Sequence, residues 1–363
     1  MKLRFYISAV MVASVMIAAR SHAQDAPTSS ESHYSTRYSV AVIDDATFYS
    51  NLSVPIPSTL NQVLLEPSFN VNINHRWSFS TSLIGATTTY SATTTQLHVK
   101  ETYAGLSAGD FDFLAGRKLV RWGTGYAFTA AGVLDPPRIA TNPSDRLNLN
   151  EGRDMVKADW VRGQHALTLA WSTAALAQKG TNLRDTTAFR YNVLVHGFDT
   201  SLIAGNDRGG DSFGALTFTR VVGQAWEIHG EAAWREHEAI LLGAKYTMAS
   251  GVTFIGEFYT PPNIAYYRDS SVSPLAGRQH YGFLNASKTR LRELPGWKEW
   301  DLSGEMVINL DDHSYTGVFD VSRWFGKHVS AYVHAEIPVG SKTSEYGAAP
   351  YSNSTSTGIR FQL

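Results

Sequence analysis

The chain of 363 residues carries 31 lysines and arginines against 32 aspartates and glutamates, contains no cysteine, and is 43% apolar. The near-zero net charge excludes a nucleic-acid-binding protein, which needs a clustered positive excess. The absence of cysteine excludes disulfide scaffolds, thiolate zinc sites and cysteine nucleophiles. Only 17% of the residues are charged and 12% are aromatic, a balance opposite to that of disordered chains.

The first 23 residues have the form of a secretory signal peptide. Two positive residues precede an apolar run from Tyr6 to Ala19, and Ser21 and Ala23 occupy the positions at which signal peptidase reads small residues. We therefore predict cleavage after Ala23. The alternative is an N-terminal membrane anchor, which needs about 20 apolar residues, and this run is shorter. Residues 24–36 are polar and serine-rich and are predicted to form a flexible lead-in.

The rest of the chain is dominated by a period-two pattern in segments of about ten residues, which is typical of half-buried strands. In the segment 226–234, Trp226, Gly230 and Trp234 fall on one face, and Glu227 and Glu231 fall on the other. No helical apolar stripe of comparable length competes with this pattern. Further apolar faces of the same kind consist of Leu97, Val99 and Tyr103, of Val156, Ala158 and Trp160, of Phe189, Tyr191 and Val193, and of Trp300, Leu302 and Gly304.

The connections between these segments alternate in length. Short connections contain turn residues and lie at 74–76, 107–110, 162–165, 222–225 and 325–328; the longer ones lie at 51–62, 121–152, 178–187, 261–278 and 341–354. This spacing predicts about 18 strands. Sixteen is the fallback, and whether the number is odd or even is open because 279–288 fits either a strand or a loop.

Alternation alone also fits a soluble β-sandwich, so the choice depends on other features. The export signal, the many strands without a domain break, and the alternating connections all favour a membrane barrel. Trp226 and Trp234 are eight residues apart, about 26 Å along a strand. At a tilt of about 40° this gives about 20 Å of height, close to the lipid-facing band between two aromatic girdles. We assign Trp160, Trp226, Trp234 and Trp300 to these girdles.

The predicted fold is therefore all-β: a transmembrane, antiparallel, up-and-down β-barrel formed by residues 37–363 as a single domain. Lipid offers the backbone no hydrogen-bond partners, so only a closed barrel satisfies every strand. Closure also removes the exposed edges of many aromatic-rich strands.

The chain resembles Gram-negative outer-membrane porins. The resemblance lies in the signal peptide, the period-two strands, the long third loop and a terminal strand S-T-S-T-G-I-R-F-Q-L, in which Ile359, Phe361 and Leu363 share one face. This ending is similar to the C-terminal assembly signal of outer-membrane barrels, although Leu363 stands where an aromatic residue is usual. The pattern covers essentially the whole mature chain but includes no residue-specific motif, so it transfers no binding residues.

The resemblance implies a place in the outer membrane of a Gram-negative bacterium. The implied partners are outer-membrane lipid and lipopolysaccharide, the outer-membrane assembly machinery and small hydrophilic solutes, with a homo-oligomer as an open alternative. The implied function is a channel whose third loop narrows the pore.

The polar faces of the strands are predicted to line the lumen. Both signs of charge are present there in similar numbers, which indicates weak ion selectivity, because selective pores carry rings of one sign. The predicted lumen wall consists of Lys157, Asp159, Arg190, Glu227, Glu231, Arg235, Lys245, Glu257, Asp301 and Glu305.

The long connection at 121–152 supplies the candidate constriction. Its guanidinium groups can pair with carboxylates of a solute, or with carboxylates of the loop itself, and both interpretations stay open. The facing of Arg117 and Lys118 is also open, because the alternation slips before the loop. The candidate constriction residues are Arg121, Asp135, Arg138, Asp145, Arg146, Glu151, Arg153 and Asp154.

Enzyme signals are weak. Residues 105–109 match G-x-S-x-G, but that chemistry needs a strand, a sharp turn and a helix, and another strand-like segment follows here. His313 and Ser314 are adjacent and therefore do not form a nucleophile–base pair by sequence alone. His334 with Glu336, and His229 with its flanking glutamates, could each contribute to a metal site, but two ligands are too few to predict one.

We predict no enzymatic activity, cofactor or metal. The alternatives are an outer-membrane barrel enzyme acting on lipid and a secreted soluble β protein that binds a ligand.

Overall fold

The computed structural model describes residues 34–136, 146–147, 149–174, 185–208, 212–234, 238–260, 280–291 and 296–363. The predicted signal peptide at 1–23 lies outside the described residues. The first strand begins at Tyr34, inside the segment that the sequence assigns to the lead-in.

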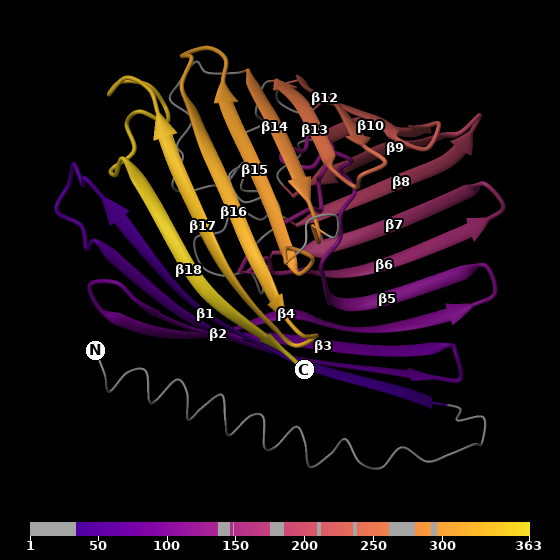
Figure 1. Ribbon diagram of the computed structural model, residues 1–363. Helices are drawn as coiled ribbons and strands as arrows, with labels where there is room; N and C mark the ends of the chain where they lie inside the picture. Colours follow the sequence, from indigo (N-terminus) through magenta and orange to yellow (C-terminus); the bar gives the residue numbers. More distant parts are fainter. Residues whose placement is uncertain are drawn as a thin grey trace.

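Within the described ranges the chain forms 18 strands and no helix (Figure 1). The segment 279–288, which by sequence fits either a strand or a loop, contains the strand β14. The strands are β1 (Tyr34–Ser50), β2 (Thr59–Ile73), β3 (Trp77–Thr89), β4 (Thr93–Ala108), β5 (Phe111–Lys118), β6 (Arg153–Arg162), β7 (His165–Thr173), β8 (Thr186–Val195), β9 (Phe198–Asp207), β10 (Ser212–Val222), β11 (Trp226–Trp234), β12 (Glu238–Thr247), β13 (Thr253–Thr260), β14 (Tyr281–Lys288), β15 (Trp300–Asn309), β16 (Tyr315–Phe325), β17 (Val329–Val339) and β18 (Asn353–Gln362).

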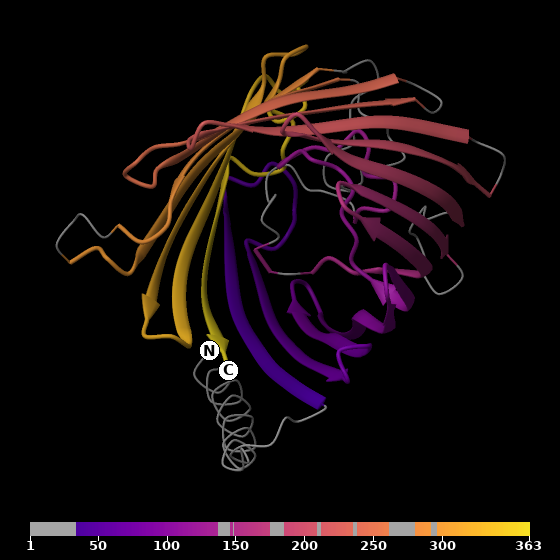
Figure 2. The ribbon, with the colours of Figure 1, turned by 90° about the vertical axis from the view of Figure 1, so that its right-hand side faces the viewer.

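The strands form one closed sheet in which each pairs antiparallel with its neighbours in the sequence. β1 closes the ring: it pairs with β2 from Tyr34 opposite Ile73 to Phe48 opposite Thr59, and with β18 from Ala41 opposite Gln362 to Ser50 opposite Asn353. Figure 2 shows the first and last strands side by side along this seam. The prediction of an up-and-down barrel of about 18 strands is confirmed.

The apolar faces of the strands point outward. Trp226 and Trp234, at the two ends of β11, are each 49% exposed, whereas His229 and Glu231 between them are almost fully buried. The predicted girdle residue Trp160 lies in β6 on the same strand face as the exposed Val156, and Trp300 is the first residue of β15. A soluble sheet would bury these faces, so the arrangement is that of a barrel whose outer surface meets lipid.

The connections fall into two sets, one at each end of the barrel. Those after β2, β4, β6, β8, β10, β12 and β16 are turns of two to five residues, and the glycines at positive φ among them include Gly109, Gly163, Gly197, Gly223 and Gly326. The longest connection, residues 119–152 between β5 and β6, belongs to the other set. Its described part, drawn in magenta in Figure 2, turns into the barrel. None of the described residues forms a helix with the length and apolarity that a membrane crossing requires.

A β-bulge in β4 changes which residues share a face. Val99 lies opposite Leu83, but Glu101 lies opposite Ser82, so Lys100 is an extra residue in the ladder. Tyr103 consequently lies opposite the buried Ser80, on the other face from Leu97 and Val99. The prediction that Leu97, Val99 and Tyr103 share a face is wrong, because uninterrupted alternation cannot represent an inserted residue.

The exposed face of β12 provides a test of the membrane barrel. Leu242 lies opposite Gly230, midway between the two tryptophans of β11, and is 53% exposed. At the bilayer midplane Leu242→Arg is expected to destabilise the barrel by about 2–4 kcal/mol. Urea unfolding in lipid vesicles measures the change, with Leu242→Phe as the matched apolar control. Equal stability of the two variants would exclude a lipid-facing position.

Candidate functional site

The segment that follows β5 packs against the inner wall of the barrel. Phe128, Ala130 and Leu134 are at most 1% exposed and belong to one apolar cluster with wall residues such as Leu241 and Tyr259. The rings of Phe128 and Tyr259 are stacked with their centroids 5.1 Å apart. Part of the connection between β5 and β6 therefore lies inside the barrel and is held there by apolar burial.

Glu231, which points inward from β11, accepts hydrogen bonds from both arms of this segment. Its Oε1 accepts from the backbone N of Thr124 and from that of Gly125 at 2.9 Å. Its Oε2 accepts from the backbone N of Ala130 and Ala131 at 2.6 and 2.7 Å. The hydroxyls of Thr124 and Thr129 add one bond to each oxygen. One carboxylate thus closes the segment into a compact turn.

Glu257, which points inward from β13, holds the part of the turn between those arms. Its oxygens accept from the backbone N of Tyr126, from that of Ala127 at 2.9 Å, and from that of Phe128 at 3.3 Å. His229 Nε2 lies 3.0 Å from its Oε1. We call Glu231 and Glu257 the loop clamp.

The composition of the segment explains why it needs the clamp. Its buried backbone N–H groups lie outside any strand and must find acceptors, because an unpaired buried donor is costly. Close approach also requires glycine: a Cβ on Gly125 would lie 2.4 Å from the carbonyl oxygen of Phe128, and one on Gly123 would lie 2.0 Å from Thr129 Oγ1. The glycine, alanine and threonine residues of the segment 123–132 therefore leave the backbone accessible to the two carboxylates.

Tyr126 extends the clamp through its side chain. Its hydroxyl donates to Glu227 Oε1 at 2.9 Å and accepts from Lys245 Nζ at 3.1 Å. Burial, the largest contribution, raises the pKa of the Tyr126 phenol above its ordinary value. The phenol therefore stays protonated and keeps its proton for Glu227.

The far end of the connection is held on the opposite side of the lumen. The Arg146 guanidinium pairs with Asp45 of β1 and donates to Tyr332 Oη of β17 at 3.2 Å. Next to it, Leu147 packs in an apolar cluster with Ile43, Leu64 and Ile84 of the inner wall. The connection therefore reaches from β11–β13 across to β1–β3.

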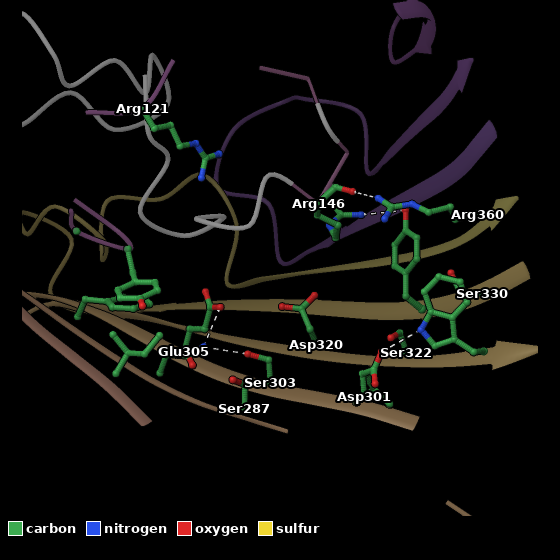
Figure 3. Close-up of a pocket in the computed structure, with 18 of the residues that line it drawn as sticks. Arg121, Arg146, Ser287, Asp301, Ser303, Glu305, Asp320, Ser322, Ser330 and Arg360 are labelled. Atoms are coloured by element: carbon green, nitrogen blue, oxygen red, sulfur yellow. Dashed lines mark hydrogen bonds between the residues drawn. The ribbon is translucent and has the colours of Figure 1, made fainter. Parts of the chain in front are cut away.

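A cavity of about 730 Å³ lies between this connection and strands β13–β18. Figure 3 shows Arg121 and Arg146 of the connection, with Arg360 of β18, on one side of it, and Glu305 and Asp320 on the strand side. The lining also includes serines and aromatic rings: Ser287, Ser303, Ser322, Ser330, Tyr126, Phe283, Trp324 and Tyr332.

The structure separates the predicted constriction residues. Arg121 and Arg146 line the cavity. Asp135 accepts from the backbone N of Trp122 and Gly123, and Arg153 Nη1 donates to the carbonyl of Val133 at 2.9 Å, so both shape the connection instead. Arg138 and Asp145 lie outside the described residues.

Glu151 and Asp154 lie away from the cavity. Arg117 binds Asp154 through two nitrogens, at 3.1 and 2.6 Å, and its Nη1 lies 3.5 Å from Glu151, which also contacts His98 at 3.1 Å. This group belongs to the barrel wall, because β5 ends at Lys118 and β6 begins at Arg153. The structure does not bring these two predicted residues together with Arg121.

The predicted lumen-wall residues that the structure describes lie on inner faces but have different partners. Lys157 pairs with Asp159, and Arg190 Nε donates to Ser201 at 2.9 Å. Lys245 and Glu227 meet at Tyr126. Glu231 and Glu257 form the clamp, Asp301 and Glu305 line the cavity, and Arg235 lies outside the described residues.

Sequence reasoning missed several residues of the site. Asp320, Trp324, Tyr332 and Arg360 line the cavity, and Asp45 anchors Arg146. The available signal was the alternation of β16–β18, since Asp320, Ser322 and Trp324 occupy the face opposite to that of the exposed Phe319 and Phe325.

The serines of the two weak enzyme signals donate hydrogen bonds to neighbouring aspartates. Ser107 Oγ donates to Asp112 Oδ1 across the β4–β5 turn, and Ser314 Oγ donates to Asp312 at 2.6 Å and not to His313. Among the residues that the structure describes, no group of three or more potential metal ligands occurs.

Comparisons with known proteins agree on the fold. No protein-family model matches the sequence, and no curated protein matches it. Among solved structures, Pseudomonas aeruginosa OccK11 (OpdR) is similar at 9% identity, with 90% of this chain and 96% of that chain covered and a TM-score of 0.60. P. aeruginosa OccK5 (OpdH) is similar at 7% identity, with 90% and 98% covered and a TM-score of 0.58.

Wzi, an outer-membrane protein of Escherichia coli described as a carbohydrate-binding β-barrel, is similar at 9% identity, with 89% and 84% covered and a TM-score of 0.57. These likenesses concern the fold. The chain is a porin-like outer-membrane β-barrel in architecture, as the sequence pattern predicted.

The loop clamp predicts a specific effect of Glu231→Gln. A glutamine has one acceptor oxygen and turns its NH2 toward the donors of one arm, so buried donors lose partners in hydrogen bonds of about 1.5–3 kcal/mol each. We expect amide hydrogen exchange of residues 124–131 to accelerate at least about tenfold, measured by mass spectrometry on the folded protein in detergent.

The matched control for that experiment is Glu227→Gln. Glu227 contacts the segment through the side chain of Tyr126, so its variant should leave these amides nearly as protected as in the wild type. Equal exchange in the two variants would contradict the clamp.

Proposed function

We propose that the protein is an outer-membrane channel through which small hydrophilic solutes diffuse, and that residues 119–152 narrow it. The observation that carries the proposal is the loop clamp. Glu231 and Glu257 fix part of the connection between β5 and β6 inside a closed barrel, beside a cavity of about 730 Å³ whose lining includes serine, carboxylate and guanidinium groups. A polar lining lets a solute exchange water for wall groups along its path.

The proposed location is the outer membrane of a Gram-negative bacterium. The exposed tryptophans at both ends of β11 and the apolar outer face support it, because such a surface is stable only in lipid. The signal-like N-terminus and the C-terminal strand support export and barrel assembly. In this orientation the long connections face outside and the short turns face the periplasm.

We further propose that the channel discriminates weakly between anions and cations. Three guanidinium groups (Arg121, Arg146 and Arg360) and three carboxylates (Asp301, Glu305 and Asp320) line the cavity, so neither sign predominates. Strong selectivity comes from rings of one sign.

The location is tested by fractionation of the cells that produce the protein. We expect the protein in the outer-membrane fraction, and we expect it to migrate differently on a denaturing gel before and after boiling, because a closed barrel resists detergent until heated. Recovery from the soluble periplasm without detergent would contradict the proposal.

The narrowing role is tested by deleting residues 129–148 and measuring single-channel conductance in planar bilayers. We expect the conductance to rise, because the deletion removes Ala130, Ala131 and Arg146 together with their contacts to the inner wall. Shortening the rim connection at 52–56 is the control and should leave conductance unchanged. Equal conductance of wild type and deletion would rule out the narrowing role while leaving a channel intact.

A further inference from the structure

A buried histidine lies beside the carboxylates of the loop clamp. His229 points inward from β11, and its side chain is fully buried. Its ring meets the ring of Tyr126 edge-on, with the centroids 5.4 Å apart. It also lies against Gly243 of β12, where a Cβ would be 2.2 Å from Nε2, so only glycine leaves room for the ring. The imidazole is therefore packed between the barrel wall and the connection.

The two ring nitrogens of His229 have different surroundings. Nε2 lies 3.0 Å from Glu257 Oε1, and because an ionised carboxylate only accepts, Nε2 carries a hydrogen and donates it. Nδ1 is buried and has no hydrogen-bond partner among the described residues. Glu227 Oε1 is 3.9 Å from Nδ1, which is too far for a hydrogen bond. The site therefore suits the neutral imidazole, and a proton on Nδ1 would have no acceptor.

The titratable groups around this histidine belong mostly to the barrel wall. Three carboxylates and one lysine of the wall stay in place whether or not the connection is held, so they attract an imidazolium in both states. What release of the connection changes is the access of water to the ring. The groups are Glu227 and Glu231 of β11, Lys245 of β12, Glu257 of β13 and Tyr126 of the connection, and β10 presents Thr219, which does not titrate.

Protonation of His229 weakens the hold on the connection in either of two ways. If Glu227 keeps the hydrogen bond that it accepts from the Tyr126 hydroxyl at 2.9 Å, the new N–H and its charge stay buried without an acceptor, which is costly. If Glu227 turns to Nδ1 instead, the phenol loses its acceptor. Release of the connection removes both costs, because water then reaches the ring. Acid therefore favours the released connection.

The part of the connection next to His229 also lines the cavity. Thr124, Gly125 and Tyr126 are lining residues, and their backbone N–H groups donate to the two carboxylates of the loop clamp. A change in how firmly this segment is held therefore changes the shape of the cavity.

From these contacts we propose that His229 is a proton-sensitive switch: the neutral ring lets the loop clamp hold the connection, and the protonated ring releases it and widens the channel. The proposal rests on the proposed channel function and names its regulation. Histidine in ordinary surroundings changes its charge between about pH 5 and pH 8. The hold on the connection is thus complete above this range and is lost as the pH falls through it.

The first test follows the backbone amides of residues 124–131 by hydrogen exchange in the full-length protein in detergent, at about pH 7.5 and about pH 5. The readout is the protection factor, which removes the intrinsic pH dependence of exchange. We expect it to fall about tenfold in acid, the effect of one unpaired buried donor. His229→Gln keeps an N–H for Glu257 but gains no proton, so its protection factors should stay nearly constant.

The matched control is His334→Asn. His334 is a second inward-facing, nearly buried histidine beside a carboxylate, and its Nδ1 lies 2.8 Å from Asp320 Oδ1. That carboxylate belongs to β16 and not to the loop clamp. The variant should therefore keep the wild-type fall in protection of residues 124–131.

The second test measures single-channel conductance in planar bilayers at the same two pH values. We expect the conductance of the wild type to rise in acid and that of His229→Gln to rise less. The comparison between the two proteins removes the effect of other groups that titrate in the lumen. Equal changes in both proteins would overturn the effect of the switch on the channel.

The outcomes separate the switch from the channel itself. Unchanged protection of residues 124–131 in acid, or an equal fall in wild type and His229→Gln, would overturn the switch and leave the channel standing. No conductance above that of a protein-free bilayer at either pH would overturn the channel function, whereas the exchange experiment does not depend on conduction. Folding of each variant is verified by its heat-dependent gel migration, and the wild-type exchange at the two pH values tests the switch without any variant.

Discussion

Closure of the sheet is the constraint on which the rest of this structure depends. Lipid offers no hydrogen-bond partners, so β1 must pair with β18 as well as with β2, and it does so over registers of ten and fifteen residue pairs. Once the ring is closed, alternation along every strand divides the molecule into an apolar outer face and a polar inner face. The exposed Trp226 and the buried Glu231, on one strand, show both consequences of that constraint.

Closure also creates the conditions for the loop clamp. A carboxylate buried on an inner face needs donors, and a backbone segment without strand partners needs acceptors. Glu231 and Glu257 accept hydrogen bonds from the backbone N–H groups of residues 124–131, so the carboxylates gain donors and the backbone gains acceptors. The same carboxylates would be solvated charges on an open sheet. Inside the barrel they position the connection, and so determine where the cavity and its two charged sides lie.

The sequence predicted the strands well and the partners of the loop poorly. Alternation is a local property, so the faces of 226–234 could be read directly, and a β-bulge at Lys100 was enough to misplace Tyr103. Glu231 was expected to line the lumen, and nothing local indicated that it binds residues about a hundred positions earlier. Glu151 and Asp154 were placed with Arg121 because they lie in or next to the same connection, but Arg117 of the neighbouring strand binds them at the wall.

The sequence by itself determined the low charge fraction, the even balance of 31 against 32 charges and the period-two pattern, and hence a barrel of about 18 strands with its apolar side outward. Composition and net charge are sums over the residues, and the period-two pattern depends only on residues that are neighbours along the chain. The tertiary structure alone decided which carboxylates hold the connection and which line the cavity. The reason is physical: the sign of the field at a point depends on which side chains lie around it, and barrel closure brings together residues that are far apart in the sequence.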